Sequence, residues 1–251
     1  MLRDKDSTNL SFRVANHSVA AIIPAHNEGR NILTVLEVLH QSNTLDEIIV
    51  VNDGSTDNTE CLANQMAQID PRIRIIGLNS NKGKGEAVLS GWHSTQASIL
   101  LLLDADLINL NVHHIQSLIH PVLEGHVDMT VGSFRGGKIP TDLAHIATPW
   151  LSGQRCLKAE LLKSISIKAA AGYGLETAIS VTAMQNQWHC CKVILRGVTH
   201  PQSESHRGFY KGFMNRVKMY TEILRAYWIA QHEGPTKHST SFRSHSEYKK
   251  I

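Results

Sequence analysis

Two carboxylates, at positions 104 and 106, directly follow an unbroken apolar run at Ile99–Leu103. The run predicts a buried strand, so both acids would emerge close together where that strand ends. Like charges at such a spacing cost free energy unless a cation compensates them. Carboxylate oxygens are ligands that Mg²⁺ and Mn²⁺ prefer. The Asp104-Ala105-Asp106 segment therefore predicts a divalent-cation site, and the alternative is a pair of solvated acids in a loop.

Three more polar clusters each follow an apolar run that is typical of a strand. They are PAHNE at 24–28, NDGSTD at 52–57 and NKGKGE at 81–86. Taken alone, the second cluster favours a turn with a helix cap. In the third, two glycines let the backbone approach an anion and two lysines supply charge. Its spacing matches neither a P-loop nor a dinucleotide fingerprint.

The apolar runs alternate with helical patterns, which indicates an α/β fold with a mostly parallel sheet. The runs at 19–23, 47–51, 73–78 and 99–103 predict strands, and 28–40, 59–69 and 86–94 predict helices. Apolar residues on both sides of a strand are expected where helices cover both faces of a sheet. Ligands of such sheets bind at the carboxyl ends of the strands. We therefore expect the four polar clusters to converge on one edge.

The second half of the chain has a less regular pattern. Asp128–Phe134 and Lys192–Val198 predict strands, and Lys158–Ile165 and Leu175–Gln185 predict helices. Residues 209–230 predict a long amphipathic helix. Its apolar stripe is typical of a core or homodimer contact, and its lysines and arginines also admit a peripheral membrane contact.

Composition excludes several classes of protein. The 251 residues are 42% hydrophobic, so the chain is not disordered, and a net charge of +3 is too small to indicate nucleic-acid binding. Four cysteines without a CxxC pair exclude a thiolate zinc site and indicate reduced thiols in the cytoplasm. The polar N-terminus has no apolar signal region. We expect a flexible segment at 1–18, one domain at 19–232 and a flexible basic tail at 233–251.

The four clusters, taken together and in order, resemble family 2 glycosyltransferases of the GT-A fold. SGQR at 152–155, GYGLE at 172–176 and GVTH at 197–200 are similar to segments of bacterial glucosyl-3-phosphoglycerate synthase-like proteins. The resemblance implies a single GT-A domain with a C-terminal helical extension. Residues 19–106 would form the nucleotide-binding half, and 107–232 the acceptor half. It also implies a metal-dependent sugar transfer from a nucleotide-sugar donor, such as a UDP- or GDP-sugar.

The resemblance also assigns roles to individual residues. The residues implied at the base and ribose are Pro24, His26, Glu28, Asp53 and Asp104. Lys84 is implied near the diphosphate, and Asp106 and His200 as ligands of Mg²⁺ or Mn²⁺. Glu176 has three interpretations: a base for the acceptor hydroxyl, a group beside the sugar, or an acid that favours a helix N-terminus.

The same resemblance implies an anionic acceptor, such as 3-phosphoglycerate, held by Lys138, Thr141 and Arg155. The loop of Lys138 and Thr141 departs from the family pattern, and an ordinary mobile loop is the competing interpretation. A polyprenyl-phosphate transferase resembling dolichol-phosphate mannose synthase is the alternative function. A nucleotide-sugar pyrophosphorylase fits less well, because PAHNEGRN lacks the glycine-rich signature of those enzymes. A sugar-nucleotide sensor would not need the DAD acids.

Overall fold

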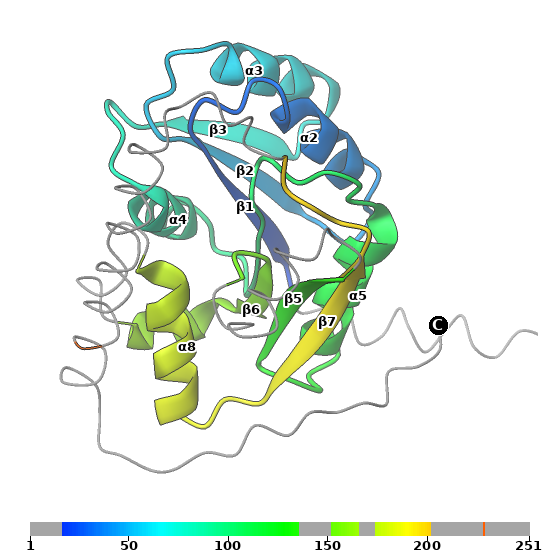
Figure 1. Ribbon diagram of the computed structural model, residues 1–251, viewed down its shortest axis with the longest axis vertical. Coiled ribbons are helices and arrows are strands. Elements are labelled where there is room, and N and C mark those ends of the chain that lie inside the picture. The colour runs from blue at the N-terminus through cyan, green and yellow to red at the C-terminus, as the bar shows by residue number, and fades with distance from the viewer. Residues whose placement is uncertain (1–16, 136–151, 166–173, 202–227, 229–251) are drawn as a thin grey trace, which may run out of the picture.

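The computed structural model describes residues 17–135, 152–165, 174–201 and Trp228. Within them, one sheet of seven strands runs in the order β3-β2-β1-β4-β6-β5-β7 (Figure 1). The strands are β1 (Val19–Ala25), β2 (Glu47–Asn52), β3 (Ile73–Gly77), β4 (Ile99–Leu102), β5 (Met129–Arg135), β6 (Arg155–Lys158) and β7 (Cys190–Arg196). In this sheet β6 runs antiparallel to both of its neighbours, and the other pairs are parallel.

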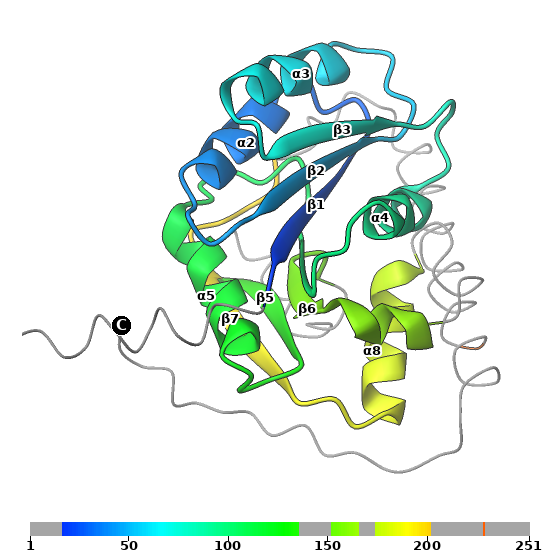
Figure 2. The same ribbon diagram turned by 180° about the vertical axis from the view of Figure 1, so that it is seen from behind.

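Helices cover both faces of the sheet, which explains why its strands are apolar on both sides. The helices are α2 (Ile32–His40), α3 (Thr59–Ile69), α4 (Lys84–His93), α5 (Val112–Leu123) and α8 (Leu175–Gln185), with a 3₁₀ helix, η2, at Ala159–Ser164. Helices α2, α3 and α5 pack on one face, and α4 and α8 pack on the other (Figure 2).

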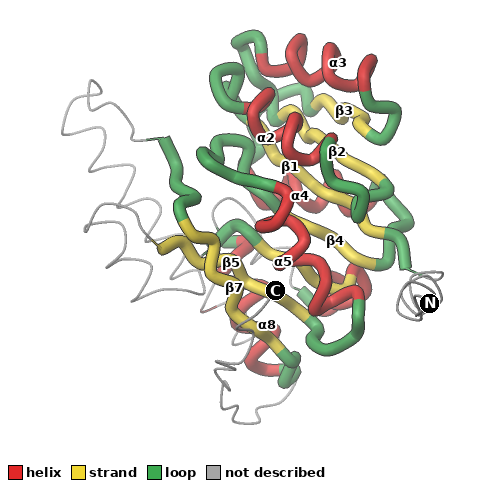
Figure 3. Tube along the Cα trace, turned by 90° about the vertical axis from the view of Figure 1, so that its right-hand side faces the viewer, coloured by secondary structure: helices red, strands yellow, loops and turns green. Residues whose placement is uncertain are grey.

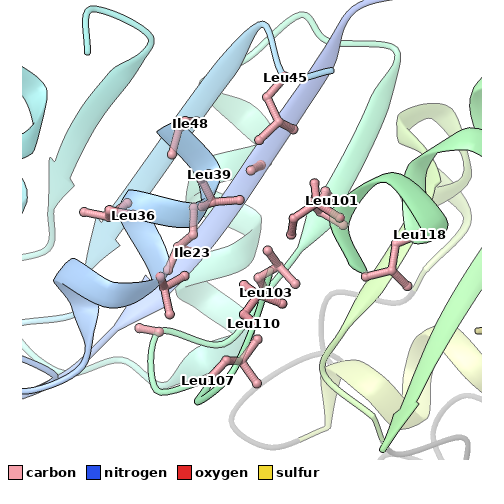
Figure 4. Close-up of a cluster of buried hydrophobic side chains, with 14 of the residues drawn as sticks. Ile23, Leu36, Leu39, Leu45, Ile48, Leu101, Leu103, Leu107, Leu110 and Leu118 are labelled. Atoms are coloured by element: carbon pink, nitrogen blue, oxygen red, sulfur yellow. The ribbon is translucent and has the colours of Figure 1, made fainter. Parts of the chain in front are cut away.

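Alternate residues of each central strand enter the two apolar layers. Ile23 of β1 joins the layer beneath α2 and α5, where Leu36, Leu101 and Leu118 are all fully buried (Figure 4). Its neighbour Ile22 enters the layer beneath α4 and α8. Burying a side chain of this size stabilises the fold by roughly 1.5–3 kcal/mol, so the two layers hold the sheet rigid under the site.

Strand direction decides which loops meet. Strands β1 to β4 are mutually parallel and lie side by side (Figure 3), so the segments that follow them emerge at one edge. Because β6 is antiparallel to β4, with Arg155 opposite Leu102, the chain just before β6 lies beside the end of β4. An isolated bridge between Ile108 and Thr199 draws the segment after β7 to the same place.

The α/β architecture expected from the sequence is confirmed, with three main corrections and two additions. The helix predicted at 28–40 begins only at Ile32, because residues 29–31 form a turn. Residues 159–164 form a 3₁₀ helix where a longer helix was predicted, and the last strand spans Cys190–Arg196 where 192–198 was predicted. Helix α5 and strand β6 were not predicted. The helix expected at 209–230 lies outside the described residues except for Trp228. The two predicted flexible ends also lie outside them, except for His17 and Ser18. No helix in the described ranges is long and apolar enough to cross a bilayer.

Candidate active site

Residues far apart in the sequence meet at the carboxyl edge of the parallel strands. Asp104 and Asp106 follow β4, and Lys84 begins α4. Glu176 lies in the first turn of α8, and His200 follows β7. The structure thus brings together five of the residues that the sequence singled out.

Lys84 bridges two carboxylates from different elements. Its Nζ lies 2.5 Å from Oδ1 of Asp104 and 2.6 Å from Oε1 of Glu176, and all three side chains are at most 26% exposed. Burial alone would lower the pKa of Lys84, but the charges of the two carboxylates outweigh it and raise that pKa. Burial would likewise raise the pKa of Asp104, but Lys84 outweighs it and holds that pKa below its usual value. The ammonium is therefore a fixed positive charge at the centre of the site.

The segment before β6 supports Asp104 from its other side. The side-chain amide of Gln154 donates from Nε2 to Oδ2 of Asp104 at 2.7 Å, and Ser152 Oγ donates to the side-chain Oε1 of Gln154 at 3.0 Å. A Cβ at Gly153 would overlap Lys84 Nζ and lie 2.7 Å from Oδ2 of Asp104. Sequence reasoning did not assign Gln154 or Gly153 to the site, although the SGQR motif marked the segment.

Asp104, Asp106 and His200 form a group that fits a divalent cation. One ligand atom of each lies within 4.8 Å of the others. His200 Nδ1 is 2.9 Å from Oδ1 of Asp106, and its Nε2 is 4.0 Å from Oδ2 of Asp104. Burial would lower the pKa of His200, but its hydrogen bond to Asp106 outweighs it and raises that pKa. Two carboxylates with an imidazole suit Mn²⁺, and the carboxylates alone suit Mg²⁺.

The residues predicted at the nucleotide lie around the same edge. Pro24 lines a narrow pocket together with Lys84 and Glu176. The exposed His26 ring donates from Nδ1 to the carbonyl of Asp53 at 2.7 Å. Burial raises the pKa of Glu28, an effect that the nearby acids reinforce and a hydrogen bond from Asn31 opposes.

Asp53 directly follows β2 and is buried at this edge. It is 3% exposed, and its carboxylate accepts backbone N–H groups from Lys82 at 2.7 Å and Gly83 at 2.8 Å. The carboxylate therefore holds the NKGK loop, and a direct contact with a base stays a prediction.

Arg155 is fully buried beneath α8. Its Nε donates to the carbonyl of Ser152 at 2.8 Å, and both terminal nitrogens lie 3.1 Å from Ser180 Oγ. Ser180 Oγ in turn donates to the carbonyl of Glu176 at 2.8 Å. Burial lowers the pKa of Arg155 to about 10, an effect that the charge of Glu176 opposes. Its role at an acceptor stays a prediction, and the predicted acceptor residues Lys138 and Thr141 lie outside the described residues.

Comparison with known proteins identifies the family. The model of "Glycosyl transferase family 2" matches residues 20–196, which is more than half of the chain. The chain belongs to glycosyl transferase family 2. The matched range holds every site residue named above except His200.

Among curated relatives, the glucosyl-3-phosphoglycerate synthase of Mycobacterium tuberculosis is 27% identical over 201 residues. That match covers 66% of this chain and 61% of the relative, so this chain spans less than two thirds of that relative's length. A dolichyl-phosphate beta-glucosyltransferase of Trichomonas vaginalis is 36% identical over 94 residues, covering 34% of this chain and 28% of the relative.

Solved structures agree on the fold. A complex of the M. tuberculosis glucosyl-3-phosphoglycerate synthase with Mn²⁺, UDP-glucose and phosphoglyceric acid superimposes with a TM-score of 0.71 at 22% identity. The match covers 96% of this chain and 93% of that one. A complex of the same enzyme with Mg²⁺ and UDP has a TM-score of 0.71 at 22% identity, covering 94% and 86% of the two chains. The GT-A fold is thereby confirmed.

Proposed function

We propose that this protein transfers a sugar from a nucleotide-sugar donor to an acceptor with the help of Mg²⁺ or Mn²⁺. One observation carries the proposal: the Asp104, Asp106 and His200 group lies directly beside the Lys84 bridge between Asp104 and Glu176. The residues that could bind a cation therefore lie at the same edge of the pocket as the Lys84 ammonium. A donor's diphosphate is the group that needs both.

The metal would be held by Asp106 and His200, with Asp104 beside them. When bound, such a cation offsets the negative charge that develops on the leaving nucleoside diphosphate. Lys84 adds its own positive charge to that end of the donor. Pro24, His26, Glu28 and Asp53 form the side of the pocket for the base and ribose.

Glu176 is proposed to lie at the reacting end of the sugar. Its carboxylate is 12% exposed and is held 2.6 Å from Lys84, so it is oriented before any substrate arrives. In an inverting transfer it would accept the proton of the acceptor hydroxyl. In a retaining transfer it would remain a negative charge beside the sugar. Product stereochemistry separates these two roles.

For the acceptor we propose a small phosphorylated molecule, bound by Lys138, Thr141 and Arg155. The M. tuberculosis relative has been crystallised with phosphoglyceric acid and with glycerol 3-phosphate, which supports this class. The second candidate is a polyprenyl phosphate, which the local identity to a dolichyl-phosphate beta-glucosyltransferase favours. Both acceptors carry a phosphate that a cationic site would hold.

The test is a screen of nucleotide-sugar donors, each assayed without an acceptor and with one of two acceptors. UDP-, GDP- and ADP-glucose are incubated with Mn²⁺ or Mg²⁺, alone, with 3-phosphoglycerate, or with a polyprenyl phosphate in detergent, and released nucleoside diphosphate is measured. We expect one donor to be cleaved faster with 3-phosphoglycerate and a glycosylated product to form. Stimulation by the polyprenyl phosphate instead would select the second candidate. Release of a sugar 1-phosphate would indicate a pyrophosphorylase and contradict the proposal.

A further inference from the structure

A three-residue segment before β6, Ser152-Gly153-Gln154, lies against the Asp104 carboxylate. Gln154 is fully buried, and its side-chain Nε2 donates to Oδ2 of Asp104 at 2.7 Å. The Oε1 of the same amide accepts from Ser152 Oγ at 3.0 Å, which turns the amide nitrogen toward the acid. Gln154 is therefore an oriented donor to one oxygen of Asp104.

The backbone of this segment is anchored on both sides. The Gln154 carbonyl accepts from the N–H of Gly132 in β5 at 2.8 Å. The buried Arg155, which begins β6, donates from Nε to the carbonyl of Ser152 at 2.8 Å. The Gln154 side chain therefore starts from a fixed point within the sheet, and its amide is in place before any ligand binds.

The glycine of the segment leaves room for the ion pair between Lys84 and Asp104. A Cβ at Gly153 would overlap Nζ of Lys84 and would lie 2.7 and 2.8 Å from the two carboxylate oxygens of Asp104. All three atoms are the ends of side chains, so a methyl group there would displace the ion pair and leave the backbone in place. Position 153 must therefore lack a side chain if the ion pair is to keep its position.

Gln154 differs from Lys84, the other direct partner of Asp104, because it carries no charge. Lys84 pairs with Oδ1 of Asp104, while the amide bonds Oδ2, the oxygen that lies 4.0 Å from His200 Nε2. A neutral donor orients a carboxylate without cancelling its charge, whereas a second ammonium would compensate the charge that a cation needs. Gln154 therefore restricts the rotation of Asp104 and leaves its negative charge available beside His200.

We propose that Gly153 and Gln154 are positioning residues: together they fix the Asp104 carboxylate and its Lys84 partner where a divalent cation and a nucleoside diphosphate bind. The proposal rests on the proposed function, which supplies those two ligands. Without the amide, the Asp104 carboxylate can turn about its side-chain bonds. Ordering it again when the ligands bind costs free energy, so the affinity falls.

The experiment is calorimetric titration of UDP, GDP and ADP, each with Mn²⁺, into the full chain and its variants. Gln154→Met keeps the length of the side chain and removes the donor, so we expect each nucleotide that the parent binds to bind about fivefold more weakly. Gly153→Ala keeps every donor but displaces the ion pair, and we expect a loss of about tenfold or more. Parent-like affinity in either variant would overturn the proposal.

Thr130→Val is the matched control. Thr130 is as deeply buried as Gln154, but its hydroxyl donates to the carbonyl of Leu118 in the middle of α5, away from the site. This variant should lose thermal stability and bind the nucleotides as the parent does. An equal loss of affinity in Thr130→Val would mean that general destabilisation explains the data, and would overturn the proposal. If Gln154→Met does not fold, Ser152→Ala removes only the hydroxyl that orients the amide, with an expected loss of about threefold.

A ligand-free measurement separates this proposal from the proposed function. In the ¹⁵N-labelled chain, the side-chain amide signal of Gln154 is assigned by its absence from Gln154→Met. We expect its protons to exchange slowly and to resonate downfield in the parent, and to move back toward the usual position in Asp104→Asn. A signal that Asp104→Asn leaves in place would overturn the proposal. A parent that binds no nucleotide would defeat the proposed function, while this signal would still decide whether Gln154 holds Asp104.

Discussion

Two clusters of charged side chains lie at opposite edges of the sheet, and they differ in how their charges are matched. At the amino ends of the strands, Arg72 pairs with the buried Asp70 at 2.7 Å. The same guanidinium donates to the backbone carbonyls of His40, Ser42 and Leu45. His40 Nδ1 lies 2.9 Å from Oδ2 of Asp70, the oxygen that the Arg72 guanidinium also contacts. This cluster ties the end of α2 to the start of β3.

At the carboxyl ends of the strands the charges do not balance. Among the described residues there, four carboxylates face two permanent cations and one imidazole: Glu28, Asp104, Asp106 and Glu176 against Lys84, Arg155 and His200. Lys84 is shared between two acids, and within the described part of the chain the Asp106 carboxylate is hydrogen-bonded by His200. A saturated cluster is typical of a structural role, whereas an excess of acid leaves charge for a cation to bind. The difference predicts opposite consequences when an acid is removed from each cluster.

The largest expected effect belongs to Asp106. Asp106→Asn should lower the transfer rate at least about 100-fold, because a ligand of the charge-compensating cation is lost. The melting temperature should stay within about 2 °C of the parent or rise, because one of several crowded acids becomes neutral. Initial rates and thermal unfolding of the same preparation check both. A large loss of melting temperature would show that this cluster is structural as well.

Asp70→Asn should do the reverse. Replacing this carboxylate removes charge-assisted hydrogen bonds from Arg72, which we expect to cost about 2–3 kcal/mol of unfolding free energy. For a chain of this size that lowers the melting temperature by roughly 5–10 °C, with the rate at 25 °C unchanged. A variant that melts normally but transfers slowly would contradict the contrast between the clusters.

The same carboxylate makes stability depend on pH. Hydrogen bonds from Arg72 lower the pKa of Asp70, and burial raises it by less. The native pKa therefore lies far below the unfolded value of about 3.9. Its stabilisation is therefore present above about pH 4 and is lost as the pH falls toward the lower native pKa. Unfolding free energies measured between pH 5 and pH 2 should fall less steeply for Asp70→Asn than for the parent. Equal slopes would show that Asp70 does not contribute to acid sensitivity.

A smaller effect is expected at His200. His200→Ala should weaken Mn²⁺ binding about tenfold and Mg²⁺ binding less, since imidazole suits Mn²⁺ better. Titration of each metal in the presence of the donor nucleotide measures the two affinities. Asn109→Gly is a suitable control, because it removes a neighbouring hydrogen bond to the carbonyl of Gly197 and glycine tolerates the φ of 59° at this position. Equal losses for both metals would mean that His200 acts only by orienting Asp106.

The first half of the fold could be predicted because its signals are local. Strands β1, β2 and β4 contain unbroken apolar runs, β3 has a run broken only by Arg74, and α3 begins and ends where the spacing of its apolar residues predicts. Helix α5 was not predicted, because His113, His114 and Pro121 interrupt its pattern of apolar residues, although His114 is buried. Strand β6 has four residues, too few for a period, and its pairing with β4 depends on distant partners.

For the candidate site, the sequence predicts which segments meet but not the contacts between their side chains. The convergence of Asp104 and Lys84 could be predicted because parallel strands bring their ends together. His200 was assigned to the metal only through the family resemblance. The contacts within the site could not, since they depend on side-chain geometry. Nothing local in SGQR indicates that Gln154 supports Asp104 or that Arg155 braces Ser180 under Glu176. Likewise, NDGS does not reveal that the oxygens of Asp53 accept from the NKGK backbone.

The central claim is that the acid excess at the carboxyl edge binds a divalent cation together with a nucleoside diphosphate. It is tested most directly by electron paramagnetic resonance of Mn²⁺, titrated into the parent and Asp106→Asn with and without the nucleoside diphosphate found in the donor screen. We predict tight Mn²⁺ binding to the parent only with the nucleotide, weakened at least tenfold in the variant. Equal Mn²⁺ affinity in both proteins, or binding indifferent to the nucleotide, would contradict the account.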